Sequence, residues 1–145
     1  MPSLVVAAGL AIAGCGSPGT PEDEIRALVD AAERAAEERD ASALRALVAD
    51  DYEDPAGRDA TDIRALLHGY LIAHQSLRLI TRIDSIELEG KELARVRVTV
   101  GVLGREAVSE SNWDLAGDVH RLDIRLARGD DEEWRAIRAG PQQEP

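Results

Sequence analysis

Side chains able to do acid/base chemistry are few in this sequence. A general acid or base needs a titratable group in a water-poor cavity, with partners that fix the geometry of proton transfer. His74 follows Tyr70 by four residues and so shares a helix stripe with it, while His120 is in phase with Leu122 along a strand. If the chain is an enzyme, the base is His120 or His74 and its partner is Asp114 or Tyr70, since a polar partner can orient an imidazole. The full set of inward candidates is Tyr52, Tyr70, His74, Trp113, Asp114 and His120.

The same side chains also fit an ordinary structural role. A lone His on an apolar face is more often a core residue than part of a functional pocket. Tyr70, Trp113 and Trp134 stand at core spacing, so we expect their rings to be buried with the polar atoms near the rim. We therefore expect a non-catalytic protein. The residues that would line a pocket for a small apolar ligand are Tyr52, Tyr70, His74, Trp113 and His120.

Metal-binding and phosphate-binding motifs are missing from the sequence. The acidic run from Asp50 to Asp54 lacks the spaced Asp/Asn-Gly pattern and the distal Glu of a calcium loop. The histidines stand at positions 68, 74 and 120, so none share the spacing of paired helical ligands. A Gly-rich phosphate loop and a G-x-S-x-G nucleophile turn are also missing. We expect no metal and no cofactor.

Composition excludes further classes of protein. The chain has 145 residues, 44% of them hydrophobic, which is enough for the core of one domain and too apolar for a disordered chain. It carries 28 acidic and 17 basic side chains, a net charge of −11, whereas a nucleic-acid binder needs a basic surface. One Cys excludes an intrachain disulfide framework.

The first half of the sequence has helical spacing. Thr20-Pro21-Glu22-Asp23 is a helix start signal, with Thr as N-cap and Pro at the first helical position, and apolar residues carry the helix to about Arg39. Asp40 can cap a second, shorter helix. A third helix is predicted to begin near Thr61 or Asp62, after an acidic loop.

From Leu77 onward the spacing changes to strand alternation. The phase slips near Asp84-Ser85, which predicts a bulge and a bend in the first strand. Gly129-Asp130-Asp131 predicts a hairpin turn before the last strand. The further strands are predicted around Val96–Val102, Trp113–Leu115, His120–Leu126 and Trp134–Ala139. Three helices followed by such strands give an α+β fold, with helices on one face of a curved antiparallel sheet.

This order of elements, closed by Glu133-Trp134-Arg135-Ala136-Ile137, resembles the nuclear transport factor 2-like superfamily over about 21–139. The resemblance implies a cone-shaped fold with a pocket between the helices and the concave sheet, and it brings no established activity. The Tyr/Asp site of the ketosteroid-isomerase type and the His/Asp patterns of the dehydratase and cyclase branches find no matching residues here. Short stretches also resemble small proteobacterial lipoproteins: Asp51-Tyr52, His74-Gln75-Ser76, Thr81-Arg82-Ile83-Asp84 and Asp118-Val119-His120-Arg121-Leu122.

Charge is unevenly distributed along the chain. The segment Glu22–Asp62 holds 14 acids and 5 arginines, so it carries −9 of the total charge of −11. Outward positions of the predicted strands form an arginine-bearing sheet face: Arg95, Arg97, Arg121 and Arg125. These arginines are either paired across strands, at about 0.2–1 kcal/mol per pair, or form an interface. The resemblance favours a homodimer through this face, and another envelope protein is the alternative partner.

The N-terminal residues predict where the protein is located in the cell. Leu4 to Gly14 is an uncharged apolar run of eleven residues, which fits a secretory signal and is too short to span a membrane. Ile12-Ala13-Gly14-Cys15 resembles the lipobox of bacterial lipoproteins, and the resemblance implies a lipid on Cys15 and attachment to the periplasmic face of the outer membrane. Ala11-Ile12-Ala13 is also an ordinary cleavage site, which would release a soluble periplasmic protein. The expected organisation is a signal peptide at 1–14, a flexible tether at 15–20, the folded domain at 21–140 and a frayed tail at 141–145.

Overall fold

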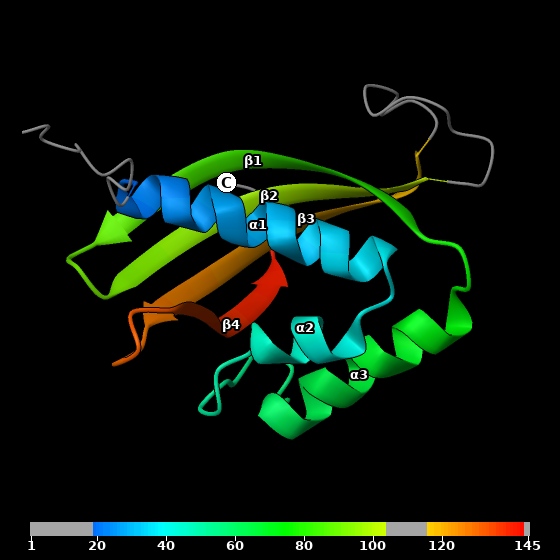
Figure 1. Cartoon of the computed structure of the whole chain (residues 1–145), viewed down its shortest axis with the longest axis horizontal. Helices are drawn as coiled ribbons and strands as arrows, with labels where there is room; N and C mark the ends of the chain where they lie inside the picture. Colours follow the sequence, from blue (N-terminus) through cyan, green and yellow to red (C-terminus); the bar gives the residue numbers. More distant parts are fainter. Residues whose placement is uncertain (1–18, 104–115, 144–145) are drawn as a thin grey trace, which may run out of the picture.

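The computed structural model describes residues 19–103 and 116–143, and these form three helices followed by four strands (Figure 1). Cys15, Trp113 and Asp114 lie outside the described residues, as does the short strand predicted at Trp113–Leu115. The order of helices and strands is the predicted α+β order. The elements are α1 (Pro21–Glu37), α2 (Ala41–Ala46), α3 (Ala60–Ala73), β1 (Arg78–Glu89), β2 (Leu93–Leu103), β3 (Ala116–Arg128) and β4 (Trp134–Pro141).

Each helix begins at a polar cap. Thr20 caps α1 and forms a reciprocal capping box with Asp23, as its sequence predicts. Asp40 caps α2 by accepting a hydrogen bond from the Ala43 backbone N–H. Asp59 caps α3 and forms a second capping box with Asp62, so α3 begins at Ala60, slightly before the predicted start. These caps satisfy backbone N–H groups that have no partner inside a helix.

The four strands form one antiparallel sheet in the order β1-β2-β3-β4. The register of β1 shifts between Ile83 and Ser85, which confirms the predicted bulge. A second register shift lies between β3 and β4, where Arg125 pairs with Arg138 and Leu126 pairs with Ala136. Ile137 is therefore the extra residue of a bulge in β4, and this bulge matters for the site described below.

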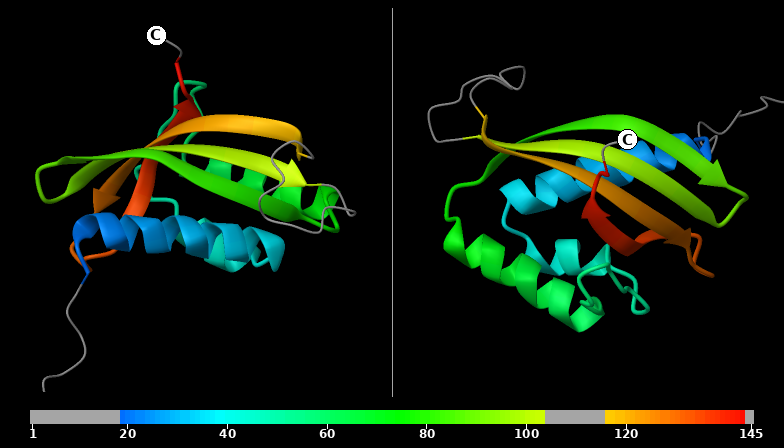
Figure 2. Two further views of the ribbon diagram at one scale, coloured as in Figure 1. Left: turned by 90° about the horizontal axis from the view of Figure 1, so that it is seen from above. Right: turned by 180° about the vertical axis from the view of Figure 1, so that it is seen from behind.

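The two faces of the sheet differ in what covers them. Val96 and Leu126 point to the face on which α1 lies, and they form a buried core with Ile25 of α1. Trp134 closes this core as predicted: its ring is buried, and its Nε1–H donates to Glu24 at 2.9 Å. Figure 2 shows α1 lying along this face. Because side chains alternate along a strand, the residues between the core residues point to the opposite face.

The loop between α2 and α3 covers the outer edge of the sheet. Val48 forms an isolated parallel bridge with Ala136 of β4, and Ala49 N–H donates to the Ala136 carbonyl at 2.9 Å. An unpaired edge strand is a template for aggregation, so this loop protects β4. Among the described residues, no helix combines the length and apolar content needed to cross a membrane.

Candidate interaction face

A row of arginines crosses three neighbouring strands on the face opposite α1. Arg95 of β2 pairs in register with Arg125 of β3, and Arg125 pairs with Arg138 of β4. Residues opposite each other in an antiparallel pair point to the same face. Arg97 and Arg121 occupy outward positions of the same sheet face, as the sequence predicts. We call this surface the arginine face; its members are Arg95, Arg97, Arg121, Arg125 and Arg138.

Asp123 is the acidic partner of two of these arginines. Arg95 donates from Nε to both carboxylate oxygens of Asp123, at 2.9 and 3.0 Å, and its Nη2 makes a further hydrogen bond to Oδ2. Arg97 Nε lies 3.8 Å from the same carboxylate. Arg95 holds the pKa of Asp123 below its usual range, chiefly by this hydrogen bonding, and Asp123 in turn raises the pKa of Arg95. The negative charge of Asp123 is therefore balanced mainly by Arg95.

Arg125 acts on Asp123 only through its charge, which helps to lower the pKa of that carboxyl, and Arg138 forms no ion pair with a described carboxylate. Within residues 19–103 and 116–143, no carboxylate forms an ion pair with either guanidinium, and both side chains are exposed. Two like charges placed directly opposite each other in a sheet are destabilising. The fold thus holds two cations side by side with their hydrogen-bond donors facing solvent.

A groove of about 410 Å³ lies at this end of the row. Three arginines and one aspartate give its lining a net charge of +2, in a protein whose total charge is −11. Its volume falls inside the range of about 300–1,000 Å³ that small-ligand sites occupy. The lining residues are Pro55, Arg95, Asp123, Arg125, Arg138, Gly140, Pro141 and Gln143.

The wall of the groove is held by a buried carboxylate. Asp54 accepts hydrogen bonds from the backbone N–H groups of Ala56 and Arg58, from Arg58 Nε at 2.8 Å and from the Tyr52 hydroxyl at 3.1 Å. Gly57 completes the turn with a φ of 79°, a left-handed conformation that glycine adopts without strain. This turn places Pro55 against Gly140, where an added Cβ would lie 3.5 Å from the proline ring.

The pKa values of this pair follow from burial and hydrogen bonding. Burial alone would raise the pKa of Asp54, but the hydrogen bonds from Arg58 and Tyr52 outweigh it and hold the pKa below its usual value. Burial, reinforced by the hydrogen bond to Asp54, raises the pKa of Tyr52 to about 12. Asp54 is therefore an ionised carboxylate that organises the loop, and Tyr52 remains protonated beside it.

A second polar network borders the arginine face at the bulge of β1. Asp84 accepts hydrogen bonds from the Thr99 hydroxyl at 2.6 Å, from Arg82 Nε at 2.9 Å and from Gln142 Nε2 at 3.1 Å. Burial opposes ionisation of Asp84, yet these donors together lower its pKa. Gln142 follows β4 directly, so this network ties the end of the chain's last strand to the sheet.

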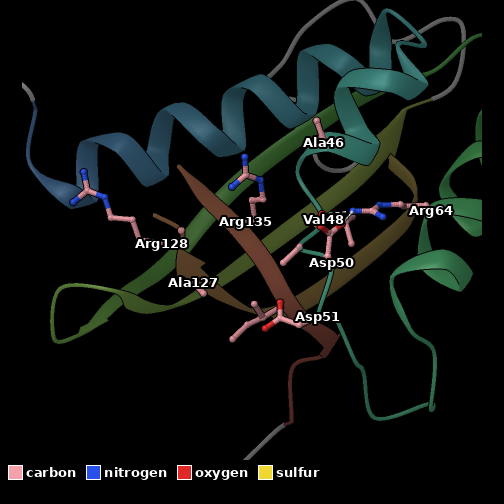
Figure 3. A pocket seen from close by; sticks show the side chains of 11 residues that line it. Ala46, Val48, Asp50, Asp51, Arg64, Ala127, Arg128 and Arg135 are labelled. Carbon is pink, nitrogen blue, oxygen red and sulfur yellow. Dashed lines mark hydrogen bonds and ion pairs between the residues drawn. The ribbon is translucent and has the colours of Figure 1, made fainter. Parts of the chain in front are cut away.

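A larger cleft of about 620 Å³ lies between the α2–α3 loop and the ends of β3 and β4 (Figure 3). Its arginines are already paired: Arg64 with Asp50 at 2.9 Å, Arg135 with Asp131 at 2.6 Å and Arg128 with Glu24 at 3.4 Å. Arg64 also donates to the Val48 carbonyl at 2.8 Å. Because these cations hold loops and strands together, the arginine face offers the more available charge.

The described residues that were predicted to line a pocket do not gather around one cavity, and only Tyr70 and His74 lie together. Tyr52 is buried but bound to Asp54, as described above. Tyr70 is 40% exposed, so the expectation of a buried ring was wrong for this residue. His74 ends α3 as its C-cap and is exposed, and its ring stacks on Tyr70 at 4.1 Å between centroids. Leu66 and Tyr70 are both exposed whereas Leu71 is buried, so the buried stripe of α3 is narrower than its apolar spacing predicts.

His120 lies on the helix-facing side of the sheet, opposite Val100, as its phase predicts, but its side chain is exposed. In the part of the chain that the structure describes, neither His74 nor His120 is hydrogen-bonded to a carboxylate; His74 Nδ1 instead lies 2.9 Å from the Tyr70 carbonyl oxygen. The described ranges also hold no cluster of three or more His, Cys, Asp and Glu side chains placed to bind a metal ion. The described residues thus assemble no acid/base site.

Two residues of the site escaped the sequence prediction. Simple alternation from Trp134 puts Arg138 on the helix-covered face, and only the bulge at Ile137 moves it beside Arg125. The sequence placed Asp54 only in an acidic run without a calcium-loop pattern and gave no sign that this residue is 3% exposed. The Pro-Ala-Gly that follows Asp54 marks a tight turn, and an Asp at the start of such a turn commonly accepts backbone hydrogen bonds.

Comparison with known proteins shows which fold the chain has, but it does not place the chain in a sequence family. No family model matches the sequence, and no curated protein matches it significantly. A Nostoc punctiforme domain of unknown function with a cystatin-like fold is similar over 89% of this chain and 80% of its own, with 16% identity and a TM-score of 0.67. An NTF-2-like protein of unknown function from Shewanella oneidensis is similar over 82% of this chain and 96% of its own, with 16% identity and a TM-score of 0.62.

A third similar structure is a Thiobacillus denitrificans protein described as a calcium/calmodulin-dependent protein kinase type II association domain. It is similar over 86% of this chain and 96% of its own, with 19% identity and a TM-score of 0.63. Helices packed on one face of a four-stranded antiparallel sheet are shared with such structures. The chain has the nuclear transport factor 2-like fold that its sequence pattern predicts.

Proposed function

We propose that this chain is a lipid-anchored protein of the cell envelope that works by binding an acidic partner protein on its arginine face, without catalysis. The observation that carries the proposal is the row Arg95–Arg125–Arg138, in which two of three guanidinium groups have no carboxylate partner among the described residues. Guanidinium groups are planar forks that bind carboxylates with two hydrogen bonds at once. An acidic surface would supply the counter-charges that the fold leaves out.

The charged lining favours a protein partner over a small apolar ligand. Apolar ligands need pockets lined mainly by hydrophobic and aromatic side chains. The groove at the arginine face is lined instead by charged, proline, glycine and amide residues. The cores of permanent interfaces are depleted in charged residues, so this face suits a polar contact that forms and dissociates.

Packing two arginine faces against each other is electrostatically unfavourable. Each copy would bring Arg125 and Arg138, which have no ion-pair partner among the described residues, toward the same guanidinium groups of the other. A second copy fits better through its acid-rich segment Glu22–Asp62, which carries a charge of −9. The name of the Thiobacillus neighbour refers to association, which is compatible with a binding role. Self-association is therefore one outcome that the test below must separate from binding to another protein.

The anchor is proposed from the sequence. Cys15 is the only Cys of the chain, and it stands at the end of the Ile12-Ala13-Gly14-Cys15 pattern. Acyl chains on that residue would hold the domain at a bilayer, and two or more chains make such attachment durable. The alternative is cleavage after Ala13 to give a soluble periplasmic protein.

Binding is tested with an acidic peptide. Fluorescence anisotropy of a labelled 16-residue poly-glutamate should report saturable binding to the wild-type protein at low salt. The double variant Arg125→Gln/Arg138→Gln should weaken binding by about tenfold or more, because each charge-assisted hydrogen bond that is lost carries about 1.5–3 kcal/mol. The matched control is Arg26→Gln/Arg45→Gln, which removes two exposed arginines from α1 and α2. Equal affinity in both double variants would refute the role of the arginine face.

Sedimentation velocity of the unliganded protein separates the possible partners. A monomer that binds the peptide supports a different protein as partner. Concentration-dependent association that Arg125→Gln/Arg138→Gln abolishes would instead assign the face to a second copy.

The proposed lipid attachment and location are tested by expression in a Gram-negative host. Intact mass and detergent partitioning should show a processed, acylated, membrane-bound species, and Cys15→Ala should abolish it. A soluble product that begins at Gly14 would contradict the anchor while leaving the binding role open to the peptide test.

A further inference from the structure

The groove beside Arg125 and Arg138 is open to solvent, yet it has a wall and a floor that a flat charged face would lack. Pro55 forms a wall on the β4 side, and Gly140 leaves the adjacent position of the sheet without a side chain. Asp123 and Arg95 lie next to Gly140 and Arg125 in the strand register. The result is an open recess of about 410 Å³, and two neighbouring strands supply the guanidinium donors that pair with no carboxylate in the described ranges.

We propose that this groove is an oxyanion site that takes the phosphoryl group of a phosphomonoester between Arg125 and Arg138. Such a group carries a charge of about −1.5 to −2 at neutral pH, which matches the +2 of the groove lining. It also presents three terminal oxygens, enough to accept hydrogen bonds from two guanidinium forks at once. A single carboxylate carries only one negative charge, so it would balance only half of the +2 of the groove lining.

The geometry of the recess supports a discrete site. Directly opposed residues of an antiparallel pair have Cβ atoms about 4.5–5.5 Å apart, so both side chains can reach one small anion. Arg95 is held by Asp123, which leaves Arg125 and Arg138 as the two available donors. The volume exceeds that of a bare phosphate and leaves room for the group that the phosphate is attached to.

This site goes beyond the binding of an acidic protein, because it depends on the shape of one recess as well as on charge. Gly140→Ala separates the two proposals. The added methyl group would lie against Pro55 at an ordinary contact distance of 3.5 Å, so the fold can accept it, while it occupies space in the groove and changes no charge. Phosphate binding should fall in this variant, whereas binding of poly-glutamate over the wider arginine face should persist.

Inorganic phosphate is the probe for the test. Isothermal titration of the purified protein, with chloride replacing phosphate at constant ionic strength in the reference, should give saturable one-site binding in the millimolar range. Arg138→Gln should weaken it about tenfold or more, since it removes a charged donor. Gly140→Ala should weaken it several-fold, and Arg26→Gln on α1 should leave it unchanged. The absence of saturable binding, or equal binding in wild type and Arg138→Gln, would overturn the site.

A second arm identifies the source of the phosphoryl group. The protein is mixed with phosphatidylcholine vesicles that do or do not contain phosphatidic acid, whose headgroup is a phosphomonoester. Sedimentation with the phosphatidic acid vesicles, reversed by free phosphate and absent in Arg138→Gln, would assign the site to a lipid headgroup. If phosphate binds in the first arm and the vesicles do not, the site takes a soluble phosphomonoester.

Discussion

Arg125 of β3 and Arg138 of β4 lie directly opposite each other on the sheet face that no described helix covers, and no carboxylate of the described residues pairs with either. A cross-strand pair of like charges is unfavourable for folding. This pair lies beside a groove, and it is the basis of the binding role proposed above. The same pair should lower the free energy of unfolding of the protein.

Arg138→Glu should stabilise the folded protein. The substitution turns an opposed pair of like charges into an opposite-charge pair with Arg125, and such pairs contribute about 0.2–1 kcal/mol. Urea unfolding should therefore show a higher midpoint with an unchanged slope. A loss of stability of similar size would contradict an unfavourable interaction between Arg125 and Arg138.

Loss of the Tyr52 hydroxyl should lower the free energy of unfolding, because this hydroxyl helps to hold the turn at Asp54. Tyr52→Phe removes one hydrogen bond to Asp54, while the donors from Ala56 and Arg58 remain, so the cost should be about 0.5–1.5 kcal/mol. Equilibrium unfolding measures the cost. Tyr70→Phe is the matched control, because Tyr70 is partly exposed and its ring stacks on the exposed His74, outside the core. Equal stability of wild type and Tyr52→Phe would show that this hydroxyl does not help to hold the loop.

Stability should fall at both ends of the pH range. The pKa values of Asp54, Asp84 and Asp123 are lowered in the folded protein, and that of Asp131 is lowered to about 2 by its hydrogen bond with Arg135. These groups contribute stability above the ordinary carboxyl pKa of 3.8, and the contribution is lost as the pH falls through their folded values.

At the alkaline end the sign is reversed. The pKa of Tyr52 is raised from 10.0 to about 12, so the folded protein keeps a proton that the unfolded chain loses, and stability decreases as the pH rises between these values. Denaturant midpoints measured across the pH range should show both limbs. Tyr52→Phe should remove most of the alkaline limb, and an unchanged alkaline limb in that variant would count against the assignment.

Asp59→Ala tests the cap of α3. Loss of an N-cap carboxylate costs about 0.5–2 kcal/mol, and here the capping box with Asp62 is lost as well. Circular dichroism during thermal unfolding should show a lower Tm with little loss of helix at low temperature. Asp59→Ser, which keeps a capping oxygen, should recover most of the difference, and a failure to do so would point to another role for Asp59.

The sequence was sufficient for the elements whose signals are local. Thr20-Pro21, Asp40 and the phase slip near Asp84 each predict a feature that depends on neighbouring residues alone, and each was confirmed. Strand alternation likewise placed Arg95, Arg97, Arg121 and Arg125 on one outward face. Local capping chemistry and strand periodicity determine these features with little help from tertiary contacts.

The candidate site needed tertiary information. Arg138 joins the arginine face only because a bulge at Ile137 reverses the alternation of β4, and a single strand's sequence does not reveal a bulge that pairing with β3 creates. Tyr70 and His74 continue the apolar spacing of α3, but both are exposed although Leu71 between them is buried, and periodicity alone does not show which side of an apolar stripe meets the core. Burial of Asp54 depends on Tyr52 and on the packing of Pro55 against Gly140.

A charge exchange tests the central claim most directly. In an anisotropy titration at low salt, wild type should bind labelled poly-glutamate, Arg125→Glu/Arg138→Glu should lose this binding, and the matched variant Arg26→Glu/Arg45→Glu should keep it. This difference is the expected result if the arginine face selects its partner by charge complementarity. If Arg125→Glu/Arg138→Glu binds poly-glutamate as wild type does, the arginine face is not the binding surface and the proposed function is wrong.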